Sequence, residues 1–527
     1  MSQKFPYIAV VVVGLLLACC SSKPTSVPST FTALTDSVHI FPDYHGVTIP
    51  PNIAPLNFMV EDDDADAFVV EMKATSTPLV VGATSDGKID IDSVAWRQLL
   101  TEAKGKALTV KVYAQRSTGW VCYQPFTIDV AEEPIDAFLS YRLIEPGYEL
   151  YRQLGLYQRN LTNFQEAVIY ENNRSFENDN NHCVNCHNYQ NYDTKRMLFH
   201  VRAAHGGTVM VNGTEAHKVA IRHDSILTSG VYPSWHPTQP LVVFSTNKTG
   251  QVFHMYHPEK IEVLDEASDL LFYDVEANSV RHILRTKEAM ETFPCWAPDG
   301  KTLYYCSATL PPSLLNAEGS ELAVKYDSLL YNIYAMPYDS ITRTFGEPQL
   351  VVDAAGMGKS ASVPRVSPDG RYLLFTLGDY GQFHIWHKSA DLWLMDLSLV
   401  PYMGQPRPIY GTSVSHAWDT PTQPAPLTDA NSPAADSYHG WSSNGRWIVM
   451  ASRRIDGNYS RVFISYFDRN GHAHRAFLLP QRDPEHNTYL LKSYNVPELT
   501  KSPVHVTTEQ LKHVVLHTES TPAAYEN

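Results

Sequence analysis

The sequence has few positive charges for its length. Its 527 residues include 41 Lys and Arg against 56 Asp and Glu, which gives a net charge of −15. A surface that binds the phosphate backbone needs clustered cations, so the composition argues against DNA or RNA as a partner. Beyond the N-terminus, no segment approaches the roughly 18 consecutive apolar residues of a membrane-spanning helix.

Several common catalytic signatures are also missing. No serine stands in a nucleophile elbow, and no glycine spacing fits a phosphate-binding loop. No pair of carboxylates stands out among the 56 acidic residues. The sequence therefore points to no catalytic group of these kinds.

The N-terminal residues have the order of a lipoprotein export signal. In residues 1–18 one cation is followed by an uncharged apolar run, 8–18, which has the length of the apolar part of a signal peptide. The run ends in Leu16-Leu17-Ala18-Cys19, which resembles the bacterial lipobox, where the Cys thiol takes the lipid. We predict lipidation of Cys19, with Cys20 as the weaker candidate and a flexible tether at 19–33. An ordinary signal peptide with incidental cysteines is the alternative.

Strand and turn residues dominate the rest of the chain. Tyr (30) outnumbers Phe (20) and Pro (35) outnumbers Gly (27), a balance that favours strands and turns over helices. In residues 34–130, short β-branched runs alternate with turns, which predicts a small β-sandwich-like domain. Residues 131–215 lose this rhythm: 135–161 has helix-compatible spacing, and 160–191 is rich in Asn. We predict an irregular segment at 131–215.

From residue 216 to 527 the chain repeats a strand–turn–strand unit. Two copies match closely, one from Pro294 to Lys301 and one from Pro364 to Arg371, and looser copies surround Trp235 and Trp441. Asp-Gly and Asn-Gly turns between apolar strands are typical of β-hairpins. A further apolar strand closed by Asp follows each hairpin, so each unit predicts a four-stranded sheet. One such sheet cannot bury both faces alone, which predicts a radial arrangement.

The repeat P-x-W-S-P-D-G-[KR]-x-[LI]-x-[FY] resembles that of TolB-type β-propellers. The resemblance implies a mainly β fold with a propeller of about six blades. Four copies are clear, so degenerate blades are expected at Leu198–Val219 and Val504–Leu516. The whole arrangement resembles an uncharacterised family of Bacteroidetes lipoproteins that join a CxxCH segment to such a propeller, and no activity comes with that resemblance.

The strongest chemical motif is Cys183-Val184-Asn185-Cys186-His187. In this pattern two thiols add to the vinyl groups of a haem, and the adjacent imidazole ligates the iron. A thioredoxin-type redox pair would need a βαβ frame, and a zinc site would need a second Cys/His pair. We therefore predict one covalent haem c in the segment 131–215. Cys183 and Cys186 would be the thioether attachments, and His187 the proximal iron ligand.

The second axial ligand is open. His200, Met197, His205 and Met210 are the local candidates, beside a propeller histidine, and the choice, or an open position, sets the potential and the reactivity of the iron. Residues 197–201 read as a strand, in which Leu198 and His200 share one face while Met197 lies on the other. We favour His200, because Leu198 beside it can pack against the porphyrin.

Two further pairs of side chains are candidates for a role. Cys295 and Cys306 flank one hairpin turn, and an exported protein meets an oxidising space, so we predict a disulfide between them. Two buried free cysteines are the alternative. His254 and His384 occupy equivalent places in two repeats; they are either packed products of the repeat or face a haem or metal.

These features leave three functions open. In the first, the haem exchanges electrons with a protein partner that docks on the propeller. The second is a haem enzyme of nitrite-reductase or peroxidase type, although the nitrite-reductase plan needs a second cofactor and there is no second CxxCH. The third is an envelope scaffold with a structural or sensing haem. We favour electron transfer, and therefore no enzymatic activity, in a lipid-anchored protein that faces the periplasm or lies at the cell surface.

Overall fold

A computed structural model of the protein describes residues 23–145, 154–172, 182–257, 259–315, 319–399 and 423–526. The fold is mainly β, as expected. The signal segment and Cys19 lie outside the described residues. Within the described ranges, no helix is long and apolar enough to cross a membrane.

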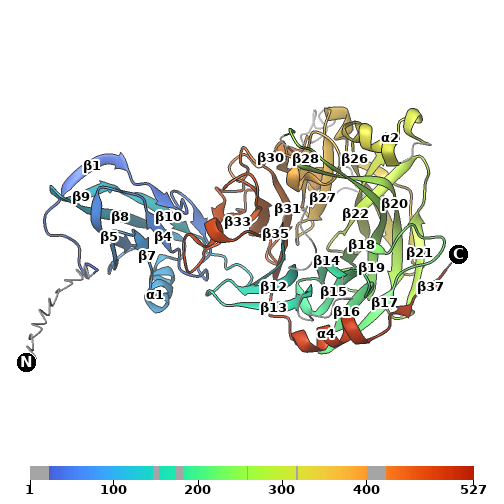
Figure 1. The fold of residues 1–527 in the computed structure, drawn as a ribbon, viewed down its shortest axis with the longest axis horizontal. Helices are drawn as coiled ribbons and strands as arrows, with labels where there is room; N and C mark the ends of the chain where they lie inside the picture. Colours follow the sequence, from blue (N-terminus) through green and yellow to red (C-terminus); the bar gives the residue numbers. More distant parts are fainter. Residues whose placement is uncertain are drawn as a thin grey trace, which may run out of the picture.

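The N-terminal part forms a domain built from two sheets and one helix (Figure 1). The larger sheet contains β1 (Thr32–Ser37), β3 (Thr48–Ile49), β5 (Ala65–Lys73), β6 (Leu79–Thr84), β8 (Lys106–Arg116), β9 (Gly119–Gln124) and β10 (Phe126–Val130). The smaller sheet contains β2 (Ile40–Phe41), β4 (Phe58–Val60) and β7 (Lys88–Ile89).

Helix α1 (Ser93–Ala103) was not foreseen from the sequence of this domain. Asp92 caps it, since its side chain accepts hydrogen bonds from the backbone of Val94 and Ala95. Trp96 and Leu100 lie one turn apart and are buried in the domain core. A helical spacing of apolar residues in α1 therefore interrupts the alternating pattern of the strands.

The rest of the described chain forms six sheets, which we number in chain order. Sheet 1 contains β11 (Phe138–Ile144), β12 (Gly155–Asn160), β13 (Glu166–Glu171) and, from near the C-terminus, β35 (Ser493–Thr500). Sheet 2 contains β14 (His182–Gln190), β15 (Asp193–Ala203), β16 (Gly207–Asn212) and β17 (Glu215–Ala220). Sheet 3 contains β18 (Gly230–Trp235), β19 (Leu241–Phe253), β20 (Ile261–Asp274) and β21 (Ser279–Leu284).

The remaining three sheets contain the two closest copies of the repeat and the copy around Trp441. Sheet 4 contains β22 (Ala289–Trp296), β23 (Thr302–Thr309), β24 (Asn332–Asp339), β25 (Thr344–Phe345) and β26 (Gln349–Val352). Sheet 5 contains β27 (Ser360–Val366), β28 (Tyr372–Gly378), β29 (Asp391–Asp396) and β30 (Ala425–Pro426). Sheet 6 contains β31 (Asp436–Trp441), β32 (Trp447–Ser452), β33 (Arg461–Tyr466) and β34 (Phe477–Leu478). Short strands β36 (Thr521–Pro522) and β37 (Ala524–Tyr525) pair with β17 and β21.

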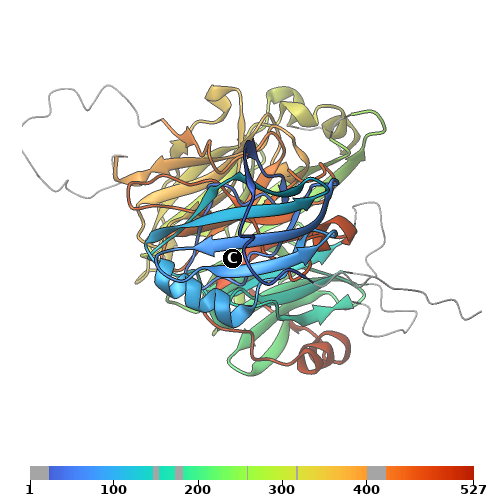
Figure 2. The same cartoon turned by 90° about the vertical axis from the view of Figure 1, so that its left-hand side faces the viewer.

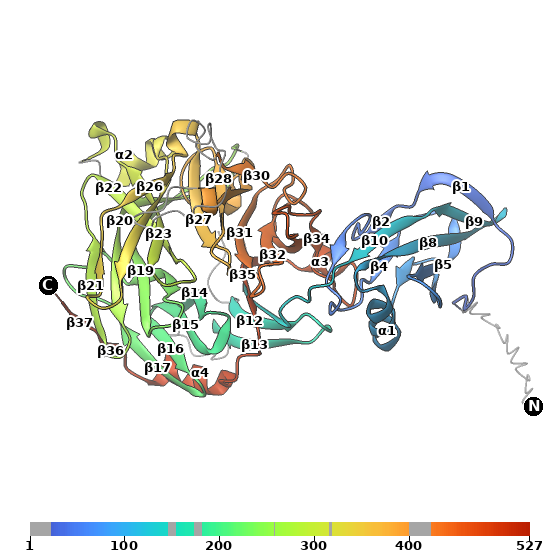
Figure 3. The same ribbon diagram turned by 180° about the vertical axis from the view of Figure 1, so that it is seen from behind.

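One strand of each sheet lies next to the corresponding strand of the following sheet (Figures 1 and 3). The contacts run from β14 to β18, β22, β27 and β31, then to β35, which itself contacts β14. Strand β35 also pairs antiparallel with β11, more than 340 positions earlier in the chain (Ser140 opposite Glu498). Strand β35, from near the C-terminus, therefore completes sheet 1, whose other three strands are the first of the six-sheet part.

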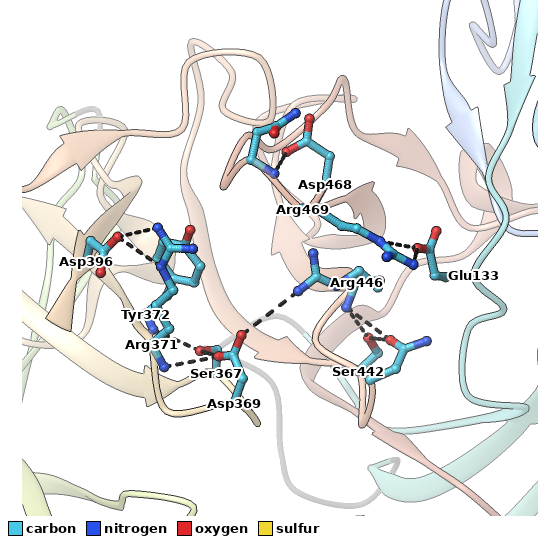
Figure 4. Close-up of polar contacts among 12 residues, drawn as sticks. Glu133, Ser367, Asp369, Arg371, Tyr372, Asp396, Ser442, Arg446, Asp468 and Arg469 are labelled. Atoms are coloured by element: carbon cyan, nitrogen blue, oxygen red, sulfur yellow. Dashed lines mark hydrogen bonds and ion pairs between the residues drawn. The ribbon is translucent and has the colours of Figure 1, made fainter. Parts of the chain in front are cut away.

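The hairpin turns of the repeat explain its Asp-Gly signature. In sheet 5, Asp369 Oδ1 accepts a hydrogen bond from the backbone of Arg371 at 3.1 Å, and Gly370 has a φ of +75°. A left-handed φ of this kind favours glycine. Arg446 of sheet 6 reaches Asp369 at 4.0 Å, so the turn also links neighbouring sheets (Figure 4).

The N-terminal domain packs against sheets 1 and 6 (Figures 1 and 3), and in Figure 2 it lies in front of the rest of the chain. Residues of both parts form one continuous apolar core, which includes Phe58 and Trp96 on one side and Tyr141 and Trp447 on the other. Glu133 links the two parts through polar contacts, because its carboxylate accepts hydrogen bonds from Arg469 at 2.9 and 3.1 Å (Figure 4). The two parts therefore share buried surface.

The expectation of an irregular segment at 131–215 is wrong. The described residues of 135–161 form strands β11 and β12 rather than a helix, and the CxxCH motif lies on strand β14. Pairing with distant strands overrides the local pattern here. Leu198–Val219 does lie in a sheet, on β15 to β17.

The expected strand at Val504–Leu516 is also wrong. Most of that segment belongs to helix α4 (Thr508–His517), which begins with a capping box between Thr507 and Gln510. The strand that completes sheet 1 is β35, which ends just before this segment.

Candidate functional site

The innermost strand of every one of the six sheets carries the same β-bulge. In β14, β18, β22, β27, β31 and β35 the pairing register slips, and one residue at the slip has a positive φ. We call these residues the bulge ring: Cys186 (φ +53°), Tyr232 (+46°), Phe293 (+50°), Val363 (+51°), Tyr438 (+46°) and Val496 (+47°). A positive φ is uncommon for residues other than glycine and concentrates at functional sites.

The bulge ring surrounds a cavity of about 260 Å³. All six ring residues line it. The charged side chains on its wall are predominantly basic: Arg142, Arg202, Arg365 and Arg453, with Glu145 and Glu498. A cavity with apolar walls and a few convergent charged groups is typical of a ligand-binding site.

The CxxCH motif lies on the wall of this cavity. In a regular strand, Cys183 and Cys186 would point to opposite faces, because they are three residues apart. The bulge at Cys186 adds one residue to β14, so Cys183, Cys186 and His187 all line the same cavity. Both cysteines are free thiols in the structure. The local backbone thus gathers the three groups that covalent haem attachment requires.

His187 is buried, and its Nε2 has no hydrogen-bond partner. Burial and the nearby guanidinium of Arg142 lower the pKa of His187 to about 3, although a hydrogen bond with the backbone of Val496 opposes this shift. The imidazole is therefore neutral at physiological pH. A neutral imidazole with one nitrogen held by the backbone and the other free is suited to ligate a metal.

The four local candidates for a second axial ligand, Met210 among them, lie elsewhere. Met197, His200 and His205 are not among the residues that line the cavity. The expected alternation of β15 is confirmed, because Leu198 packs with Met210 in one apolar cluster while Met197 belongs to another. β15 is one strand further from the cavity than β14, so its buried side chains lie between sheets.

His200 is buried opposite Asn185 of β14, and its Nδ1 has no hydrogen-bond partner. His205 is half-buried, with its ring 5.4 Å from that of His182. Among the described residues of the cavity wall, His187 is the one His, and there is no Met.

The expected disulfide is not formed. Cys295 and Cys306 are both buried and free. The bulge at Phe293 shifts the register, so that Cys306 lies opposite Thr292 and Cys295 lies opposite Tyr304. The two cysteines are therefore not a directly opposed pair.

His254 and His384 do not line the cavity either. His384 is buried and hydrogen-bonded, with Nδ1 2.7 Å from Ser362 Oγ and Nε2 3.0 Å from the carbonyl of Tyr380. The ring of His254 lies 5.1 Å from that of His257. Its two hydrogen bonds favour the interpretation that His384 is a packed structural residue of the repeat.

The sequence contains a signal for the bulge ring, because the ring residue stands directly before the first position of the repeat. Four ring residues precede proline: Tyr232-Pro233, Phe293-Pro294, Val363-Pro364 and Val496-Pro497. The other two precede histidine, in Tyr438-His439 and Cys186-His187. Aligned on this dipeptide, the CxxCH motif is one more copy of the repeat and not a separate segment.

Glu498, on the cavity wall, makes the free energy of unfolding of the protein depend on pH. Burial raises the pKa of Glu498 to about 7 from 4.5, although Arg365 and a hydrogen bond from Asn188 oppose the shift. The folded state therefore keeps a proton that the unfolded state releases above pH 4.5, and stability is lost as the pH rises from 4.5 through 7.

We expect Glu498→Gln to raise the free energy of unfolding at pH 8 by about 2–3 kcal/mol and to change it little at pH 4. Urea unfolding at the two pH values measures this difference. The exposed Glu519→Gln is the control and should have no effect at either pH. An equal effect of Glu498→Gln at both pH values would contradict the assignment.

Comparison with known proteins gives matches among solved structures alone. No family model and no curated protein matches the chain. TolB from Acinetobacter baumannii aligns with 74% of this chain and 78% of its own, at 12% identity and a TM-score of 0.37. The fold is of the β-propeller kind. The GH74 enzyme of Niastella koreensis aligns with 70% of this chain and 56% of its own, at 9% identity and a TM-score of 0.32. Likenesses this distant say nothing about activity.

Proposed function

We propose that this chain is a six-bladed β-propeller that holds one covalent haem c in its central cavity and transfers electrons to or from a protein partner. Sheets 1 to 6 would be the six blades. Two observations support closure of the ring: β35 pairs with β11, and β35 contacts both β31 and β14. A blade shared by the two ends of the chain is a common way to close such a ring.

The observation that carries the proposal is the bulge at Cys186. It turns Cys183, Cys186 and His187 to one cavity, where His187 offers a buried, unpartnered Nε2. Cys183 and Cys186 would form the thioethers and His187 would ligate the iron. A haem bound there supplies one-electron redox chemistry at its iron.

The charged residues of the cavity fit the same group. Haem carries two propionates, and arginine binds carboxylates through paired, charge-assisted hydrogen bonds. Arg142, Arg202, Arg365 and Arg453 line the cavity. Arg142 is already positioned by a hydrogen bond to Asn495 at 3.0 Å. These arginines would bind or face the propionates.

The size of the cavity favours electron transfer over catalysis on a large substrate. Its volume of about 260 Å³ lies just below the roughly 300–1,000 Å³ of most small-molecule sites. A protein partner can still exchange electrons with a haem across the cavity mouth.

Binding of a small ligand at the iron is the second candidate function. The described cavity wall offers no His or Met besides His187, and an open sixth position permits ligand binding, sensing or peroxidase chemistry. His200 as the distal ligand remains a prediction. Carbon monoxide added to the reduced protein separates the two: a shifted spectrum indicates an open position, and an unchanged one indicates a second protein ligand.

The proposed location rests on the sequence. Lipidation at Cys19 would hold the protein at a membrane of the cell envelope, facing the periplasm or exposed at the cell surface. The flexible tether expected at 19–33 is wrong for its described part, because Val27 packs on the N-terminal domain and Thr32 and Ala33 pair with β9.

The test is expression with an export signal in cells that attach haem to CxxCH motifs. We expect one covalent haem per chain, detected by the pyridine haemochrome spectrum and by the mass of the intact protein. The variant Cys183→Ala/Cys186→Ala should carry none. Cys122→Ala removes a buried cysteine in the N-terminal domain and should carry the normal amount.

Two outcomes would refute the proposal. One is a wild-type protein without covalent haem in cells that mature a control cytochrome. The other is covalent haem that persists in the double variant. Urea unfolding of each apoprotein shows whether lost haem reflects lost folding.

A further inference from the structure

The turn between β33 and β34 gathers ligand-type side chains far from the central cavity. Asp468, His472 and His474 each place a potential ligand atom within 4.8 Å of those of the other two. The three lie within seven residues, in the sequence Asp-Arg-Asn-Gly-His-Ala-His. None of them lines the cavity that contains the CxxCH motif.

The backbone of this turn orients Asp468. Its Oδ1 accepts hydrogen bonds from the backbone of Asn470 at 2.8 Å and of His472 at 3.0 Å. Gly471 has a φ of +86°, which lets the chain reverse here. Because one carboxylate oxygen holds the turn, the other, Oδ2, is left to face His474 Nε2 at 3.5 Å.

The two imidazoles are oriented as well. His474 Nδ1 lies 3.1 Å from the hydroxyl of Thr48, on β3 of the N-terminal domain, and its buried Nε2 has no hydrogen-bond partner. His472 Nε2 lies 3.0 Å from the carboxylate of Asp429. A metal-ligating His is usually held in this way through its second nitrogen.

We propose that Asp468, His472 and His474 bind a divalent transition-metal ion of the Zn²⁺ type, with a water as the fourth ligand and Asp429 holding the second nitrogen of His472. Two imidazoles and a carboxylate form a donor set that Zn²⁺ accepts in tetrahedral geometry. Bonds of about 2.0–2.1 Å put the ligand atoms of such a site roughly 3.4 Å apart. The ligand atoms, which lie within 4.8 Å of one another, have to approach by about 1 Å to reach that spacing.

The position of the cluster suggests what the ion would do. The same turn contacts the N-terminal domain through Thr48 and through Arg475, whose guanidinium lies 2.7 Å from Asp43. An ion held by Asp468, His472 and His474 would therefore stiffen the junction between sheet 6 and the N-terminal domain. It would bind the folded state alone, and so stabilise it.

The test is a titration of the metal-free, full-length protein with Zn²⁺ alone, in which calorimetry measures the heat of binding. All proteins carry Cys183→Ala/Cys186→Ala, so that the two motif thiols cannot bind the ion. We expect one site that His472→Ala and Asp468→Asn each weaken at least tenfold. Asp468→Asn keeps the oxygen that holds the turn and removes the charge. His505→Ala, which removes an exposed His elsewhere, should bind as the parent does.

The melting temperature provides the second measurement. Zn²⁺ should raise it in the parent and in His505→Ala, but not in His472→Ala. The proposal is overturned if the parent shows no saturable site, or if His472→Ala and Asp468→Asn bind as tightly as the parent; the cluster is then an ion-paired turn only. Neither result bears on haem attachment, which the titrated proteins cannot carry out.

Discussion

Replacement of His187 by Ala should change the iron ligation of the haem-loaded protein, and the same replacement at His439 should not. The two residues follow equivalent members of the bulge ring, Cys186 and Tyr438. Both are buried with an unpartnered Nε2, and burial lowers the pKa of each to about 3. They differ in that His187 lines the central cavity and His439 does not. His439 is thus a control matched for burial, charge and backbone.

The absorption spectrum and near-infrared magnetic circular dichroism measure this difference. We expect His187→Ala to lose the His-ligated signature completely while the thioethers keep the haem attached, and His439→Ala to retain it. Both substitutions remove a buried ring, so they should lower stability by similar amounts. Unchanged ligation in His187→Ala, or equal loss in both variants, would show that His187 is not the proximal ligand.

Truncation of Tyr494 should cause a large loss of stability. Tyr494 lies on β35 and is buried, with its ring 4.8 Å from that of Tyr141 on β11. Its backbone N–H donates to the carbonyl of Ser460 at 3.0 Å, which links β35 to sheet 6. The side chain therefore packs where the end of the chain joins both the first sheet and the last.

We expect Tyr494→Ala to lower the free energy of unfolding by about 3–5 kcal/mol, the usual cost of deleting a buried aromatic ring. Tyr494→Phe removes just the hydroxyl, which accepts a hydrogen bond from Gln481 at 3.3 Å, and should cost about 1 kcal/mol. Urea unfolding followed by tryptophan fluorescence measures both. A loss below 1 kcal/mol in Tyr494→Ala would show that β35 contributes little to the stability of the ring.

The chemistry of the candidate site was predictable because it depends on adjacent residues. Two thiols and an imidazole in the order Cys-x-x-Cys-His predict haem attachment without reference to the rest of the chain, and that attachment stays a prediction. The hairpin turns of sheets 4 to 6 were predictable for the same reason, since Asp-Gly and Asn-Gly specify a tight turn locally. The face alternation of Met197, Leu198 and His200 also follows from a single strand.

The surroundings of the site were not predictable in this way. The irregular segment expected around the motif is strand β14, and the helical spacing expected at 135–161 is strands β11 and β12. These strands form because they pair with distant strands such as β35. A local sequence pattern cannot reveal that pairing. Local propensity is weak compared with the burial that such pairing brings.

By itself, the sequence determined the mainly β fold, the turns of the repeat and the prediction of haem attachment at the CxxCH motif. Only the tertiary structure decided that Cys183, Cys186 and His187 face one cavity, that Met197, His200 and His205 do not, and that Cys295 and Cys306 are not directly opposed. The physical reason is that turns and alternation depend on neighbouring residues. The bulge at Cys186 and the register of β22 with β23 depend on pairing between strands, and strand pairing is determined by the packing of the whole ring.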